Sequence, residues 1–529
     1  MKNIFFSLLF FVLMYSFGAT ASYAQCTLDW SKTYGGTSGE DIVDITEGWN
    51  GNIILLSRAL LANGDINCTL KGSVDLWLIC INTEGDILWQ QCYGGTLQDE
   101  PAQIIKTNDY GYLISGYTFS NDGDVSFNHG GDDIWIIKID STGTIEWQKT
   151  FGSLAGDEPD DILQLANGKY AISCHTLGSD GDFPEHYGGV FGKDAWIIFI
   201  NPNGDTDTLL HFGGSLDDII KDLIELPNGN LMAIGNTDSH DYDLALILTY
   251  GGRDGWIFQI DSNFNTVWKR LWGGAGSDEF LSGVESNDGF LIEGSTTSNT
   301  GEFVSNHGSS DLMIVKFDTL GNLQWQKLYG GSLSDAAAWQ SRIRKINENL
   351  FSMGAWTMSN DGDVGVSHGQ TDFWFLSVDS TGNTLSSRAS GGSDNDYLLV
   401  NKEIYGVAYQ GGTTNSTDFD VVNNHGESDG WLIKIGGVNL IESSDAPKTQ
   451  ISIFPNPLHD TGTVQMDFDT FYKSKYLDVY DSYGRLLQSF LIGKYNNQFS
   501  MSNYSCGLYL YQLRSKTGEI LGGGNFLIQ

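Results

Sequence analysis

The sequence predicts an all-β fold: a seven-bladed β-propeller of four-stranded blades, closed by its N- and C-terminal strands and followed by a small C-terminal β-sandwich. Two phrases, Asp-x-Trp and aromatic–Gly–Gly, recur along the chain with steps of about sixty residues, a period that indicates an array of one supersecondary unit. The key position of the first phrase falls at Trp77, Trp135, Trp196, Trp256, Met313, Trp374 and Trp431. That of the second falls at Tyr34, Tyr93, Phe151, Phe212, Trp272, Tyr329 and, in degraded form, Ser390.

One repeat can be divided into four strands. The expected segments are an apolar strand at 102–107, a β-prone strand at 112–119, a polar stretch at 120–133 and an apolar strand at 134–139. Because the 134–139 strand is almost continuously apolar, we expect it to be buried on both faces. A hairpin turn at Asp140–Gly143 then leads into the fourth strand. Four antiparallel strands joined by short turns form one propeller blade.

The ends of the repeat array complement each other. The first fragment, Leu28–Gly36, matches only the fourth strand of the repeat, whereas the last, Asp429–Ile435, matches only as far as the third. An N-terminal strand that completes the last blade would close the ring and remove the free sheet edges of an open array. We therefore expect seven blades between residues 26 and 437.

Composition restricts the classes of partner. The chain carries 28 basic and 66 acidic residues, a formal net charge of −38. Such a field repels phosphate backbones, so we expect no nucleic-acid partner. Residues 1–24 have the pattern of a secretory signal peptide: Lys2, an apolar run at 4–17, and Ser22-Tyr23-Ala24 before a cleavage point. No later run is long and apolar enough for a membrane span, and we expect the mature chain to be a monomer without a transmembrane segment.

The C-terminal tail differs from the repeats. A polar linker is expected at 438–449, and residues 450–529 alternate strands and turns in the manner of a small β-sandwich. Three short motifs distinguish this tail from the repeats: Phe454-Pro455-Asn456-Pro457, the Asp481/Gly484/Arg485 turn and Gly507-Leu508-Tyr509. It resembles the C-terminal sorting domain of the type IX secretion system of Bacteroidetes. The resemblance implies export to the outside of the cell or its outer surface, with the type IX machinery as a partner.

The repeats also resemble a group of Bacteroidetes surface propellers that carry "W-Q-K-x-Y/F-G-G" and "S-N-D-G-D" units. This resemblance implies the propeller fold but no particular activity. The quoted units occur here, for example, in Ser120–Asp124 and Trp325–Gly331.

The loop between the second and third strands is the one segment with recurring chemistry. Four blades carry an acid-x4-His-x3-Asp pattern: Asp124/His129/Asp133, Glu302/His307/Asp311, Asp363/His368/Asp372 and Asp420/His425/Asp429. The pairs Asp122/Asp124 and Asp361/Asp363 add carboxylates at Asp-Gly-Asp spacing. One interpretation is a calcium site, with Asp122, Asp124, His129 and Asp133, or Asp361, Asp363, His368 and Asp372, as its ligands. Histidine beside carboxylates suits zinc or another transition metal better. The alternative is local: Asp side chains accept backbone amides and fix turns.

No catalytic motif was found, whether a nucleophile elbow, a His-Glu-x-x-His zinc motif or a phosphate-binding loop, so no catalytic or cofactor-binding residues are predicted. The leading hypothesis is a secreted or cell-surface propeller that binds a glycan or a protein. One alternative is an extracellular polysaccharide-acting enzyme with its site at the channel mouth, since such a site, built from different blades, escapes a linear search. The other is a purely structural surface component.

Overall fold

The computed structural model describes residues 26–436 except 190–191, 246–250 and 302–305, together with parts of the tail. The described tail segments are 452–454, 461–465, 475–480, 486–492, 498–500, 504, 507–514 and 520–528. The expected signal peptide and linker lie outside these residues. No helix within them is long and apolar enough to cross a membrane.

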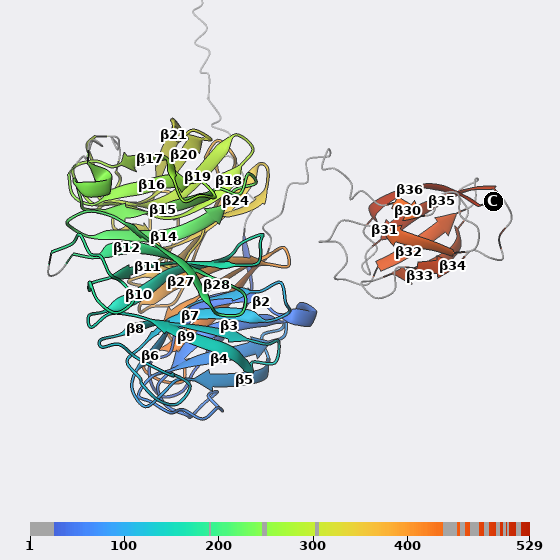
Figure 1. Cartoon of the computed structure of the whole chain (residues 1–529). Helices are drawn as coiled ribbons and strands as arrows, with labels where there is room; N and C mark the ends of the chain where they lie inside the picture. Colours follow the sequence, from blue (N-terminus) through green and yellow to red (C-terminus); the bar gives the residue numbers. More distant parts are fainter. Residues whose placement is uncertain are drawn as a thin grey trace, which may run out of the picture.

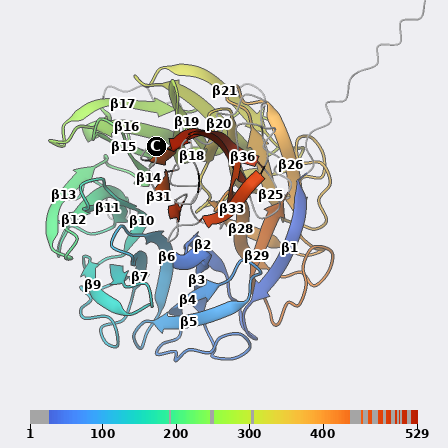
Figure 2. The ribbon, with the colours of Figure 1, turned by 90° about the vertical axis from the view of Figure 1, so that its right-hand side faces the viewer.

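Seven antiparallel sheets stand around a central axis, each with its first strand innermost (Figure 2). The first three in chain order are β2 (Ile42–Glu47), β3 (Ile53–Ala59), β4 (Asp75–Ile81), β5 (Ile87–Tyr93); β6 (Asp99–Lys106), β7 (Tyr112–Thr118), β8 (Asp133–Ile139), β9 (Ile145–Phe151); and β10 (Asp157–Gln164), β11 (Tyr170–Thr176), β12 (Asp194–Ile200), β13 (Thr206–Phe212). The next two are β14 (Asp218–Glu225), β15 (Leu231–Thr237), β16 (Asp254–Ile260), β17 (Thr266–Trp272); and β18 (Asp278–Ser286), β19 (Gly289–Thr296), β20 (Asp311–Asp318), β21 (Leu323–Tyr329).

The sixth and seventh blades depart from this simple order. The sixth has β24 (Leu350–Thr357), β25 (Asp372–Val378) and β26 (Thr384–Ser390), but its inner strand is split into β22 (Asp335–Ala337) and β23 (Arg344–Asn347). The seventh consists of β27 (Asp396–Ile404), β28 (Val407–Thr414), β29 (Asp429–Gly436) and, as its outer strand, β1 (Thr27–Tyr34). In the β1–β29 register Leu28 lies opposite Ile435 and Tyr34 opposite Gly430. The predicted seven-bladed ring and its closure are thus confirmed.

The third strand of each blade forms the centre of the core. Every residue of β4, β8, β12, β16 and β25 is buried, as the apolar run of the 134–139 segment predicted. The Asp-x-Trp tryptophans lie there, and Trp135 donates its indole N–H to Gln148 on the adjacent strand at 3.0 Å. Trp77 donates to Gln90 in the same way at 2.9 Å. These tryptophans pack the blades rather than face a ligand.

The outer strands hold neighbouring blades through their aromatic residues. Tyr93 at the end of β5 donates its hydroxyl to the carbonyl of Gly143, in the hairpin turn of the next blade, at 2.5 Å. Gly143 has a φ of +87°, and a Cβ there would lie 3.0 Å from the Tyr93 hydroxyl oxygen. Tyr329 makes the same bond to Gly382 at 2.6 Å. The aromatic–Gly–Gly phrase therefore marks a blade junction.

A buried carboxylate opens the inner strand of six blades. Asp396 accepts the Gly392 amide at 2.6 Å and the hydroxyl groups of Ser416, at 3.0 Å, and of Thr414. The equivalent residues are Asp99, Asp157, Asp218, Asp278 and Asp335, each of which accepts an amide four residues earlier in the chain. Each such carboxylate fixes the turn that joins one blade to the next.

The tail forms two sheets in strand order β30–β31–β34 and β33–β32–β35–β36 (Figure 1). Their strands are β30 (Ser452–Phe454), β31 (Thr461–Gln465), β32 (Lys475–Tyr480), β33 (Leu486–Ile492), β34 (Gln498–Ser500), β35 (Gly507–Arg514) and β36 (Ile520–Ile528). The strand content agrees with the sequence, and the packing of these sheets into a sandwich stays a prediction.

Replacing the buried carboxylate of the last blade tests its importance. We expect Asp396→Ala to lower the free energy of unfolding by about 3 kcal/mol, because buried donors lose their acceptor. Asp394→Ala, two residues away on the exposed part of the same turn, should change it by less than about 0.5 kcal/mol. Urea unfolding followed by tryptophan fluorescence measures both. Equal midpoint shifts in the two variants would contradict the structural role of Asp396.

Candidate functional site

The Asp-Gly-Asp carboxylates bind backbone amides at the blade junctions. Asp122 accepts the amide of Thr96 at 2.8 Å, and Asp124 accepts that of Gly94 at 3.1 Å as well as the Lys71 ammonium group. In the sixth blade Asp361 accepts the amide of Ser332 at 2.7 Å. The second acidic residue accepts a glycine amide of the aromatic–Gly–Gly turn in five blades, at Asp65, Asp124, Asp182, Asp243 and Asp363. In the seventh blade Asp420 instead accepts the guanidinium group of Arg388 at 3.1 Å.

The His-x3-Asp half of the pattern closes the loop on itself. Nδ1 of His129 lies 2.6 Å from Oδ2 of Asp133, which also accepts the His129 amide at 2.8 Å. In the sixth blade the amide of His368 donates to Asp372 at 2.6 Å. Burial raises the pKa of Asp372 to about 6. The histidine thus bonds to the aspartate that begins the third strand, and this bond fixes the end of the loop.

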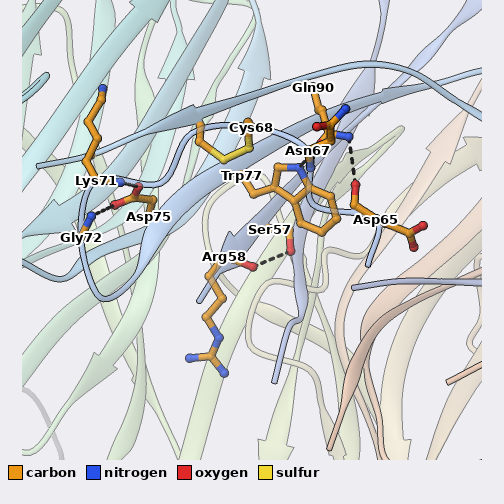
Figure 3. The surroundings of a disulfide bond; sticks show 12 residues. Ser57, Arg58, Asp65, Asn67, Cys68, Lys71, Gly72, Asp75, Trp77 and Gln90 are labelled. Carbon is orange, nitrogen blue, oxygen red and sulfur yellow. Dashed lines mark hydrogen bonds between the residues drawn. A yellow bond between two sulfur atoms is a disulfide. The ribbon is translucent and has the colours of Figure 1, made fainter. Parts of the chain in front are cut away.

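Blade one shows how the loop is held without a histidine (Figure 3). The amides of Lys71 and Gly72 donate to Asp75 at 2.5 and 3.1 Å, as the His129 amide does to Asp133. A disulfide between Cys68 and Cys92, with Cα atoms 5.7 Å apart, ties this loop to β5.

Each of the eight predicted ligands makes a local hydrogen bond through its side chain or its amide, while Oδ1 of Asp133 and of Asp372 is buried with no partner among the described residues. Within the described part of the chain, no three His, Cys, Asp or Glu side chains come together as a group that could hold a metal. Glu302, the acid of the fifth-blade loop, lies outside the described residues. The calcium and transition-metal hypotheses stay predictions, and a direct measurement has to decide them.

The inner strands are joined by a belt of side chain–backbone bonds around the channel. Asp44 accepts the amide of Ile104 in the next blade at 2.9 Å, and Asp161 accepts that of Leu223 at 2.8 Å. The full set of acceptors is Asp44, Gln103, Asp161, Asp222 and Ser282. In all five of these blades the acceptor follows a bulge in its own strand, and such irregularities re-aim side chains. The polar groups around the channel are therefore largely satisfied.

A cavity of about 680 Å³ lies in the part of the channel enclosed by the later halves of the inner strands, away from the Asp–His loops. All seven blades contribute to its wall. The basic residues in the wall are Lys106, Arg342, Arg344, Lys345 and Lys402, and the acidic ones are Glu47, Asp161, Asp222, Glu285 and Glu403. This balance of charge contrasts with the excess of acid over the whole chain.

Most of these charges are paired. Arg342 forms ion pairs with Asp161 and Asp222, from two blades across the channel. Lys402 lies 2.7 Å from Asp44, and burial lowers the pKa of Lys402 to about 8. Arg344 differs, since its buried Nε has no hydrogen-bond partner in the part of the chain that the structure describes. Burial and the nearby Arg342 charge both lower the pKa of Arg344.

These channel residues were missed by the sequence analysis. Arg342 and Arg344 come from the break between β22 and β23, which replaces a regular inner strand. The signal was present: the segment Ser341–Lys345 reads SRIRK, whereas the inner strands of the other six blades contain no arginine. The interruption of the sixth inner strand thus brings two arginines to the cavity wall.

The tail provides the firmest comparison with known proteins. Residues 452–522 match the family model described as a secretion system C-terminal sorting domain. Together with the fold, this match defines the class: a secreted or cell-surface seven-bladed propeller that carries a type IX secretion sorting domain. No curated protein sequence matches the chain.

Several solved structures are similar to parts of this chain. A protein of unknown function from Bacteroides caccae is 13% identical, with 56% of this chain and 84% of that one covered and a TM-score of 0.31. A protein of unknown function from Dyadobacter fermentans is 10% identical, with 67% and 99% covered and a TM-score of 0.38. The Pan2 WD40 domain of Neurospora crassa is 11% identical, with 78% and 96% covered and a TM-score of 0.40. We base no functional argument on these likenesses.

The metal hypotheses are tested by elemental analysis of the purified full chain after dialysis. Because the loop carboxylates already accept backbone amides, we expect fewer than about half an equivalent of calcium or transition metal per chain. A chelator should then leave the thermal unfolding midpoint unchanged. Stoichiometric metal that is reduced in both Asp124→Asn and Asp363→Asn would instead establish the loop sites.

Glu293 on β19, which is fully buried and accepts the hydroxyl group of Ser282 at 3.1 Å, provides a pH-dependent test of the blade interior. Burial raises its pKa from 4.5 to about 8. Because the unfolded chain releases this proton at lower pH than the folded chain, the stability contributed by the protonated form is lost as pH rises from about 4.5 through about 8. We expect Glu293→Gln to match the wild type in urea midpoint near pH 5 and to exceed it near pH 9. A pH-independent difference would contradict the assignment.

Proposed function

We propose that the protein is a binding module, displayed outside the cell by its sorting domain, that takes a glycan or protein group into the channel cavity. The observation that carries the proposal is the cavity of about 680 Å³ with walls from every blade. Its size falls within the range of about 300–1,000 Å³ typical of ligand sites. The half-buried apolar side chains of Leu163, Ile224 and Val284 line it beside the charged groups.

The channel is a better candidate than the Asp–His loops. Each loop uses its polar groups to fix a turn, and the same arrangement recurs from blade to blade. The cavity wall varies more from blade to blade: Gln103 stands where two other blades have Asp161 and Asp222, and Arg342 comes from the sixth blade alone. A single ligand requires one asymmetric arrangement of partners, and such an arrangement occurs in the cavity.

A channel-filling variant tests this function. The full chain is screened against immobilised glycans and peptides, alongside Val284→Trp, which places a larger ring at the cavity wall. The control is Leu154→Trp, at an exposed position on the Asp–His loop end. We expect binding to fall at least about tenfold in Val284→Trp, since the ring occupies ligand space, and to persist in the control. The proposal is refuted if Val284→Trp binds as strongly as the wild type, or if the wild type binds no glycan and no peptide on either array.

A further inference from the structure

The guanidinium group of Arg344 is chemically unusual within its surroundings. Arg342 is held by two carboxylates and Lys402 by one. In the described residues no carboxylate lies within ion-pairing distance of Arg344, and its Nε lacks an acceptor. Arginine carries five N–H donors and stays charged in proteins, so leaving such donors unfilled away from bulk water is costly.

The position of Arg344 brings its side chain to the cavity wall, with Nε itself buried. The residue lines the cavity, and Lys345, its neighbour in β23, also lines it while pairing with Glu348 at 2.8 Å. Arg344 is therefore the cavity's unpaired cation in the described structure. A planar guanidinium matches a carboxylate in a two-bond geometry, and charge-assisted bonds of this kind are the strong ones.

From this geometry we propose that Arg344 is the anchor of a binding site for small organic monocarboxylates, such as the acidic sugar of a glycan. The inference rests on the proposed function and adds the class of ligand to it. A ligand with a single negative charge fits best. The two carboxylates of Asp161 and Asp222 pair with the one guanidinium group of Arg342, which leaves this cluster with one excess negative charge. A dianion such as phosphate would bring a second negative charge beside these carboxylates without a cation to balance it.

Titration calorimetry on the full chain tests the assignment. The probes are galacturonic acid and N-acetylglycine as monocarboxylates, galactose as the neutral counterpart, and inorganic phosphate as the dianion at neutral pH. We expect the sugar acid to bind more tightly than galactose and phosphate. Binding of N-acetylglycine as well would show that the carboxylate suffices, and its absence would show that the sugar ring contributes.

Variants then assign the effect to Arg344. Arg344→Gln should weaken galacturonate binding at least about tenfold, because a charge-assisted pair is lost. Arg344→Lys should retain part of the affinity, since it keeps the charge without the planar fork. Arg270→Gln, at an exposed arginine on the outer strand β17 and away from the cavity, is the matched control and should bind as the wild type does. Circular dichroism melts of each variant verify folding, and Arg344→Lys keeps the test informative if Arg344→Gln fails to fold.

Two results separate this inference from the proposed function. If neither acid binds in the millimolar range while a neutral ligand binds in a manner sensitive to Val284→Trp, the carboxylate site is refuted and the binding function stands. Equal galacturonate affinity in Arg344→Gln and wild type also refutes it. If Val284→Trp leaves all binding unchanged, the proposed channel function itself fails.

Discussion

The ring depends on buried carboxylates that accept backbone amides where one blade meets the next. Each blade is a separate sheet, and neighbouring sheets share isolated bridges rather than a continuous ladder, as at Val74 and Gln98. The amides of the connecting turns would be left without acceptors if side chains did not supply them. Asp99 takes one such amide from within the turn, and Asp122 and Asp124 take others from the loop side. Packing between blades is added to this framework.

This role gives part of the chain's acidity a structural explanation. A net charge of −38 suggests solubility or cation binding when it is seen as a total. In the structure several carboxylates of each blade are amide acceptors, and those that open the inner strands are buried. Burial raises the pKa of Asp218 to about 7 and that of Asp157 to about 6, since the charged form is the one that burial disfavours. The junctions therefore combine strong hydrogen bonds with a sensitivity to pH.

The repeat made the fold predictable, whereas the site escaped because it lies where the repeat fails. Seven copies of a strand pattern, with complementary ends, determine blade number and closure, and the structure agrees at Leu28 and Ile435. The Asp–His pattern was found, but its spacing is equally compatible with a turn and with a metal site. Arg342 reaches Asp161 and Asp222 only because the ring brings together residues that are 181 and 120 positions apart in sequence. No local pattern encodes such a meeting.

The interruption of the sixth inner strand shows how a symmetric scaffold obtains an asymmetric site. Each of the inner strands β2, β6, β10, β14 and β18 contributes one side-chain acceptor to the belt and pairs along its length with the second strand of its blade. Between β22 and β23 the chain leaves this ladder, and Ser282 accepts the amide of Ile343 at 2.8 Å, so the belt continues through the break. With that backbone fixed, Arg342 and Arg344 on either side of Ile343 both line the cavity. Arg342 meets the carboxylates opposite and Arg344 does not. The bond from Ile343 to Ser282 thus joins the fifth and sixth blades at the segment that carries both arginines.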